Sequence, residues 1–273
     1  MCHLPSSSHR VTALPGLLGS MTNPLVAGTA DQLIKARQNH CQWDAHSAAA
    51  PESVEDAYAI QEVVTRRIGS EITAWKTSAP DAVSIPIAAP IYSSLVYNSG
   101  SKIPASELFV IGIEGEIAFR ISHDLPPGAK PYSREDLVES ISELLPAIEI
   151  VDTRMQDGFS QDKYLMLADN QSNGGLVVGK GITDWKALDF SNLEASVTAN
   201  RVIEYSGVAG NRAGDPFSLM AWAANHCANR ARPFRAGDII TTGTYTGILF
   251  VEPGTEVVVD FPGIGSVAVS FPI

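Results

Sequence analysis

Two glutamates inside an apolar run constrain this chain more than any other feature. The run from Leu108 to Ile121 has the composition of a buried strand, yet it contains Glu114 and Glu116, separated by Gly115. In a strand, residues i and i+2 point to the same face about 6.6 Å apart, so the two carboxylates project together. Burying an unpaired carboxylate is costly, so the pair requires a cation, a proton or contact with solvent. A divalent metal meets this requirement most directly, and a half-exposed edge strand is the alternative.

A third carboxylate interrupts a second apolar segment. Glu149 lies in the stretch from Ala147 to Val151, which otherwise has the composition of a short buried strand. Three carboxylates and a few waters form the hard oxygen shell that suits Mg²⁺ or Mn²⁺. The histidines and cysteines are not clustered, which argues against zinc or copper. The sequence therefore favours a magnesium or manganese site over an exposed strand.

The overall composition favours a soluble enzyme and excludes several other classes. The 273 residues carry 19 basic and 30 acidic side chains, a net charge of −11, which argues against nucleic acid or an anionic membrane as a partner. No apolar window approaches the roughly 18 residues of a transmembrane helix. The three cysteines, Cys2, Cys41 and Cys227, are widely spaced, which is typical of reduced thiols in a cytoplasmic protein.

The chain divides into three predicted regions. Residues 1–20 mix Ser, His and Pro and lack the long apolar segment of a secretory signal, so we expect a disordered leader. Residues 21–100 are expected to form a helical N-terminal region, and residues 101–273 the metal-binding catalytic domain. The boundary falls in the segment 78–102, which is rich in Pro, Ser and Ala and is predicted to be irregular.

Capping signals and apolar periodicity predict a helical first part followed by a strand-rich second part. We expect helices at residues 30–38, from Ser53 to Gly69, from Ser133 to Pro146, and from Asp215 to about Arg230. The expected strands lie at residues 72–76, 108–121, 147–151, 239–242, 256–261 and 266–271, with a strand pair within 192–205. This mixture predicts an α+β fold.

Several motifs, in the right order, resemble the fumarylacetoacetate hydrolase superfamily. They lie at residues 56–61, 112–116, 149–154, 168–172, 236–240, 243–246 and 263–267. Within the superfamily the chain is similar, over about residues 30 to 273, to the 2-keto-4-pentenoate hydratases and the related 4-oxalocrotonate decarboxylases. The resemblance implies a strand-rich β-roll core and a divalent cation bound by Glu114, Glu116 and Glu149. It also implies a homo-oligomer.

The resemblance implies a hydratase of aromatic catabolism that acts on a small 2-oxo acid. The expected substrate is a 2-hydroxy-2,4-dienoate or its 2-oxo tautomer, protonated at C5 and hydrated at C4 to a 4-hydroxy-2-oxo acid. Decarboxylation of a 2-oxo-dioate and C–C hydrolysis of an acylpyruvate are alternatives within the fold. The hydrolases use a His-Glu dyad for which this sequence offers no convincing equivalent. A catalytically silent, metal-stabilised binding protein is the alternative outside enzymes.

Three residues are predicted to carry the proton transfer. Lys76 is the first candidate for the acid or base, because a partly desolvated lysine beside a cation has a lowered pKa. Asp152 is predicted to orient Lys76 or a water molecule, and Asp169 is the other carboxylate expected to act with the lysine. A structural salt bridge from Lys76 to Asp152 or Asp169 is the alternative.

Two hydroxyls in polar turns are predicted to bind the substrate carboxylate. They belong to Ser172 and Thr246, although such turns also cap strands. The loop after Lys76, residues 77–80, departs from the Gly-Leu-Thr-Ser-like turn of the hydratases. Because this loop helps to shape the pocket in the relatives, the substrate is the least determined part of the prediction.

Overall fold

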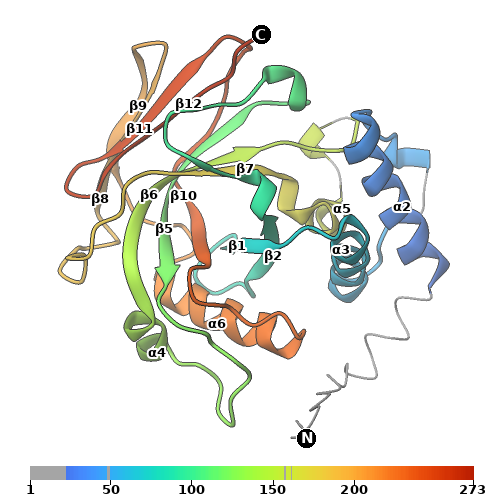
Figure 1. Ribbon diagram of the computed structural model, residues 1–273, viewed down its shortest axis with the longest axis horizontal. Helices are drawn as coiled ribbons and strands as arrows, with labels where there is room; N and C mark the ends of the chain where they lie inside the picture. Colours follow the sequence, from blue (N-terminus) through green and yellow to red (C-terminus); the bar gives the residue numbers. More distant parts are fainter. Residues whose placement is uncertain (1–22, 48–49, 157, 161) are drawn as a thin grey trace, which may run out of the picture.

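The computed structural model describes residues 23–47, 50–156, 158–160 and 162–273, and its chain forms two β-sheets with helices around them (Figure 1). The predicted leader, residues 1–20, lies outside the described residues. None of the helices in the described part is both long and apolar enough to span a membrane.

Three helices begin at the capping residues that the sequence indicates, Ser53, Ser133 and Asp215, whereas the helix expected at residues 30–38 begins earlier, directly after Asn23. The side chains of Asn23, Ser53, Ser133 and Asp215 each accept a hydrogen bond from a backbone amide in the first turn of the helix that follows. The α-helices are α2 (Pro24–Asn39), α3 (Val54–Ile68), α4 (Arg134–Glu139), α5 (Lys163–Ala168) and α6 (Pro216–Asn229).

A seven-stranded mixed sheet forms the centre of the molecule, with the strand order β2-β1-β10-β5-β6-β7-β3. Strands β10, β5, β6 and β7 are antiparallel neighbours, whereas β1 pairs with β10 in parallel. The strands are β1 (Ile72–Ser78), β2 (Ile87–Tyr92), β3 (Val96–Asn98), β5 (Gly112–Ile121), β6 (Ile141–Val151), β7 (Asn173–Val178) and β10 (Ile239–Phe250).

A second sheet of five strands has the order β4-β12-β11-β8-β9. It lies at the opposite end of the molecule from α2 and α3 (Figure 1). Its strands are β4 (Ser101–Lys102), β8 (Leu193–Ala199), β9 (Val202–Ala209), β11 (Glu256–Phe261) and β12 (Gly265–Ser270). The two sheets and the helices confirm the predicted α+β class.

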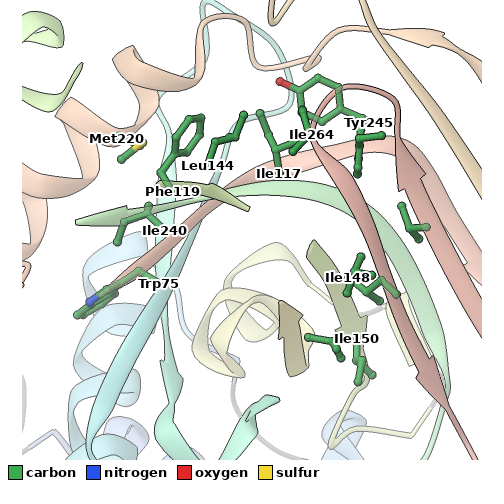
Figure 2. Close-up of a cluster of buried hydrophobic side chains, with 14 of the residues drawn as sticks. Trp75, Ile117, Phe119, Leu144, Ile148, Ile150, Met220, Ile240, Tyr245 and Ile264 are labelled. Atoms are coloured by element: carbon green, nitrogen blue, oxygen red, sulfur yellow. The ribbon is translucent and has the colours of Figure 1, made fainter. Parts of the chain in front are cut away.

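Alternate residues of the central strands face two different environments. One face packs against the second sheet and α6 in the main core, where Trp75, Phe119 and Ile240 lie (Figure 2). Their neighbours Ala118 and Ile239 point the other way and belong to a separate, smaller apolar cluster. Because strand side chains alternate, this second face also receives the even-numbered residues of β5 that lie further along the strand.

The structure corrects two predicted elements. The helix expected from Ser133 to Pro146 ends at Glu139, and β6 continues from Ile141 through Pro146, which pairs with Ile117. Leu144 packs in the main core and Leu145 in the smaller cluster, so the strand is buried on both faces. An apolar run of this kind lacks the alternation that separates a strand from a helix segment.

The second correction concerns the segment 78–102, which was expected to be irregular. It contains β2 and β3, and it ends with the short strand β4. Strand β3 pairs with β7, and β1 pairs with β10, so backbone hydrogen bonds join the chain before and after residue 100. The helices α2 and α3, which precede these strands, pack with α5 from the later part of the chain in a separate apolar cluster.

Candidate metal centre and substrate cavity

Strand register brings the three predicted carboxylates together. Glu114 of β5 lies directly opposite Glu149 of β6, and Glu116 follows two residues later on the same face. One carboxylate oxygen from each of the three residues lies within 4.8 Å of the others. The cluster is therefore a product of two neighbouring antiparallel strands in the middle of the central sheet.

Gly115 allows β5 to approach its neighbours closely at this point. A Cβ atom on Gly115 would lie 2.8 Å from Cγ2 of Thr246 and 3.0 Å from Cγ1 of Val259. The hydroxyl of Thr246 accepts a hydrogen bond of 2.9 Å from the Gly115 amide and donates one of 3.1 Å to the Gly247 carbonyl. The predicted substrate hydroxyl of Thr246 is thus engaged with backbone, and its role in binding stays a prediction.

The carboxylates carry more negative charge than their surroundings compensate. Glu116 and Glu149 are each 1% exposed. Burial raises the pKa of Glu114 to about 7, repulsion from Glu149 adds to this, and attraction to Lys76 opposes it. Burial and repulsion from Glu149 and Glu114 also raise the pKa of Glu116 well above its usual value. Three hard oxygen donors with an uncompensated charge fit a divalent cation such as Mg²⁺ or Mn²⁺.

Lys76 is the cation that lies against this cluster. The parallel register of β1 and β10 places it opposite Thr241, and its Nζ donates to Glu149 Oε1 at 2.5 Å and to the Gln171 carbonyl at 3.0 Å. Its ion pair is therefore with Glu149, not with Asp152 or Asp169.

The pKa of Lys76 is raised above its ordinary value. Burial of the ammonium lowers this pKa, but attraction to Glu149 and Glu114 outweighs the effect of burial. The lowered pKa predicted from the sequence applies to a lysine beside a bound cation, so it stays a prediction for the metal-loaded protein.

Polar groups that the sequence analysis did not single out hold the carboxylates in place. The hydroxyl of Thr241 and the amide of Gly243 both donate to Glu116 Oε2, and the Asn173 side chain donates to Glu149 Oε1 at 3.0 Å. Such bonds fix the orientation of metal ligands in proteins. The sequence signal that could have identified these groups is their position next to motifs of the family. Thr241 lies just before residues 243–246, and Asn173 lies just after residues 168–172.

Asp152 and Asp169 lie in a neighbouring ion-pair network. Asp152 accepts from two backbone amides just before β5 and lies 3.5 Å from the guanidinium of Arg154. Asp169 accepts from Arg154 at 2.7 Å and from Arg37 at 3.0 Å. Neither aspartate lines the cavity beside the glutamates. The geometry gives both a clear structural partner, and their catalytic role stays a prediction.

A strained turn connects this network to the site. Asn170, Gln171 and Ser172 have φ values of 52°, 53° and 57°, although none of them is glycine. Left-handed backbone costs such residues about 1–2 kcal/mol each, and this kind of strain clusters at functional sites. The turn directs the Gln171 carbonyl to Lys76. Within the described residues, the buried hydroxyl of Ser172 has no hydrogen-bond partner, but Ser172 does not line the cavity, and its predicted role in substrate binding stays a prediction.

A cavity of about 250 Å³ adjoins the carboxylates. One wall is formed by residues 77–80, which end β1, begin the loop after it and depart from the hydratase pattern. Another wall is formed by the loop that contains Asn211 and Arg212. The lining residues are Lys76, Thr77, Ser78, Ala79, Pro80, Glu114, Glu116, Glu149, Asn211, Arg212, Gly243 and Thr244. The cavity therefore joins an acidic floor to two walls that come from other parts of the chain.

Comparisons with known proteins agree with this geometry. The model of the fumarylacetoacetate (FAA) hydrolase C-terminal family matches residues 70–271. The chain is 30% identical over 267 residues to 2-oxo-hept-4-ene-1,7-dioate hydratase of Escherichia coli, which covers 92% of this chain and 98% of that protein. It is 26% identical over 230 residues to 2-keto-4-pentenoate hydratase of Paraburkholderia xenovorans, covering 80% and 84%.

The fold is also found in a solved structure. It is that of 4-oxalocrotonate decarboxylase from Pseudomonas putida G7, complexed with magnesium and adipate. The two chains superpose with a TM-score of 0.81 at 26% identity, over 92% of this chain and 98% of the other. The similarity extends through the N-terminal helices as well as the two sheets.

Proposed function

This chain belongs to the fumarylacetoacetate hydrolase family, and we propose that it is a divalent-metal-dependent hydratase of 2-hydroxy-2,4-dienoates, a hydro-lyase of aromatic catabolism. The observation that carries the proposal is one cavity that joins three buried carboxylates to a buried lysine. The two hydratases to which the chain is similar support the reaction class.

Glu114, Glu116 and Glu149 are the proposed ligands of Mg²⁺ or Mn²⁺. Their spacing and charge fit such an ion, and the similar decarboxylase was solved with magnesium. The chemistry that a divalent cation supplies in such a site is Lewis-acid polarisation of the 2-oxo acid, which relieves negative charge developing on the C2 oxygen. Hydrogen bonds from Thr241 to Glu116 and from Asn173 to Glu149 orient two of these carboxylates toward the proposed metal position.

Lys76 is the proposed acid and base. Lys76 lines the cavity and is 8% exposed, and the Gln171 carbonyl and Glu149 hold its Nζ in position. A positioned lysine can deliver a proton to C5 of the dienol and accept one from the water that adds at C4. Among the described lining residues, Lys76 is the only cation that is buried.

The strained turn at residues 170–172 is the proposed support for this chemistry. Asp152 donates its backbone amide to the Ser172 carbonyl at 2.8 Å, and Ser172 donates its own amide to the Asp169 carbonyl at 3.0 Å. We assign Asp152 and Asp169 as positioning residues that hold the turn. We propose that the unpaired hydroxyl of Ser172 donates a hydrogen bond to the substrate carboxylate. Thr246 supports the site indirectly, because its hydroxyl accepts a hydrogen bond from the Gly115 amide.

A spectrophotometric assay tests the proposed function. Purified protein with Mg²⁺ should remove the dienol absorbance of a 2-hydroxy-2,4-dienoate and form a 4-hydroxy-2-oxo acid. Glu114→Ala should abolish turnover, and Lys76→Met should abolish it while keeping metal binding. If no 2-oxo acid is turned over and EDTA leaves thermal stability unchanged, the proposal is wrong and a silent binding protein is favoured.

Decarboxylation is a second candidate, favoured by the similarity to 4-oxalocrotonate decarboxylase. The same metal and lysine would serve it, since both reactions develop negative charge on the 2-oxo acid. Measuring CO₂ release together with dienol loss separates the two. Hydration without CO₂ supports the first candidate, and stoichiometric CO₂ supports the second.

We also propose that the protein works in the cytoplasm as a homo-oligomer. The described cysteines, Cys41 and Cys227, are free thiols. Apolar side chains are exposed on β9, at Val202, Ile203 and Val208, and are available to a second copy. Light scattering on the purified protein tests the oligomer, and a monomer at micromolar concentration would contradict it.

A further inference from the structure

The cavity contains two cations in different situations. Lys76 is buried and paired with Glu149, whereas Arg212 is exposed and lies on the wall formed by the loop of residues 210–214. Among the described residues, Arg212 has no ion pair or side-chain hydrogen bond with the rest of the chain. A guanidinium that faces a cavity without a protein partner is available to an anion that enters the cavity.

The loop that carries Arg212 is fixed to the metal centre through backbone contacts. The Asn211 side chain donates to the Thr242 carbonyl at 2.5 Å and accepts from the Ala213 amide at 2.9 Å. The residue after Thr242 is Gly243, whose amide donates to Glu116. Arg212 is therefore held between two anchored residues, at a set place relative to the carboxylates.

The charge pattern separates the two ends of the cavity. The three glutamates lie on β5 and β6, and Arg212 lies on the connection between β9 and α6. A substrate whose 2-oxo acid end occupies the carboxylate side extends its other end toward the remaining walls. Arg212 is the only unpaired cation on those walls among the described residues.

We propose that Arg212 binds a second carboxylate at the far end of the substrate, so that the preferred substrates are 2-oxo-enedioates and not mono-acids. This inference rests on the proposed function and names its substrate class. The planar guanidinium matches a carboxylate through two parallel hydrogen bonds, which a mono-acid with an apolar end cannot form.

A matched pair of substrates tests the inference. We would measure kcat/KM for 2-oxohept-4-ene-1,7-dioate and for 2-oxohept-4-enoate with the wild-type protein and with Arg212→Gln. The ratio of the two values should favour the dioate in the wild type and fall about tenfold or more in the variant, as expected for a lost charge-assisted hydrogen bond. Arg212→Lys should retain part of the ratio, because it keeps the charge but not the planar fork.

Two controls make the test specific. Arg201→Gln removes the same charge from the turn between β8 and β9, away from the cavity, and should leave the ratio unchanged. Added salt should reduce the dioate preference of the wild type but not that of Arg212→Gln, because the pair is exposed to solvent.

The possible failures are distinguishable. An unchanged ratio in Arg212→Gln, or a parallel loss for both substrates, overturns the anchor while the hydratase function stands. If the wild-type protein hydrates neither compound, the proposed function fails and the inference that rests on it fails as well. Thermal unfolding of each variant shows whether a parallel loss comes from misfolding.

Discussion

The two faces of the central sheet differ in what they contribute, although the same strands form both. On β5, Ile117 and Phe119 point into the main core and are fully buried, whereas Glu114 and Glu116 point to the opposite face. Figure 2 shows the first face, where Ile117 and Phe119 lie near Leu144 of β6. Because side chains alternate along a strand, neighbouring residues of β5 have different roles: Ile117 and Phe119 stabilise the fold, and Glu114 and Glu116 form the candidate site.

The difference between the two faces also explains how the folded chain tolerates buried carboxylates that repel each other. The smaller apolar cluster occupies part of that face, next to the cavity, and keeps the strands aligned there. The carboxylates themselves oppose folding, because burial and mutual repulsion raise the pKa of Glu114 and Glu116. We conclude that the apolar face supplies the free energy that keeps the acidic face assembled.

Removing a carboxylate should give the largest effect and the clearest separation between the faces. Glu116→Gln should reduce kcat/KM by at least about a thousandfold, in the range that loss of an electrostatic catalytic group causes. The free energy of unfolding of the metal-free protein should not fall, since the variant removes a buried, repelled charge. Steady-state kinetics and urea unfolding in EDTA measure the two. A large loss of stability would contradict the separation.

Truncating the apolar face should give the opposite result. Phe119→Ala removes a fully buried ring that packs against Trp185 and Phe217, and it should lower the free energy of unfolding by about 3–5 kcal/mol. The folded fraction should still bind Mg²⁺ with wild-type affinity. Urea unfolding and calorimetric metal titration test this, and weakened metal binding in folded protein would show that the faces are coupled.

A histidine beside the apolar face should make stability depend on pH. His226 of α6 lies in a small pocket with Trp75, and burial, then repulsion from Arg230, lower its pKa to about 4. The unfolded chain, with a pKa near 6.5, therefore binds more protons, so stability is present above about pH 6.5 and is lost as the pH falls toward 4. The loss is at most about 3 kcal/mol, and less where solvent screens the partly exposed ring.

His226→Gln is the matched variant for this pH effect. Between about pH 4 and pH 6.5 its unfolding free energy should increase less with pH than that of the wild type, because the variant lacks the histidine but keeps the other groups that titrate there, such as Glu114. Chemical denaturation at a series of pH values measures the slope. An identical slope in both proteins would assign the acid sensitivity to other groups.

The smallest expected effect concerns the Thr241 hydroxyl, which donates a hydrogen bond to the proposed metal ligand Glu116. Thr241→Val keeps the shape but removes the hydroxyl that donates to Glu116, so the affinity for Mg²⁺ should fall about 10- to 100-fold. Thr242→Val is the control, because the buried Thr242 hydroxyl has no partner among the described residues. Calorimetry should show wild-type affinity for the control. Equal losses in both variants would indicate a general effect of β10.

Sequence reasoning succeeded where the information is local. The two-residue period places Glu114 and Glu116 on one face, and capping residues such as Ser53 and Asp215 place helix starts. It was right about the helix start at Ser133 but wrong about residues 140–146, because a strand buried on both faces has no alternation to detect. The charge inside a second apolar segment also singled out Glu149, and the family resemblance implied that it shares one cation with Glu114 and Glu116, which the register of β5 and β6 then explains.

The sequence by itself determined the donor types and which of them share a strand face, because side-chain direction along a strand depends only on residue spacing. Tertiary structure alone decided which distant groups meet. Lys76 pairs with Glu149 because β1, β10, β5 and β6 are arranged in that order, and Arg212 faces the cavity because Asn211 fixes its loop to β10. Contacts of this kind depend on strand order and loop docking, which no spacing along the chain encodes.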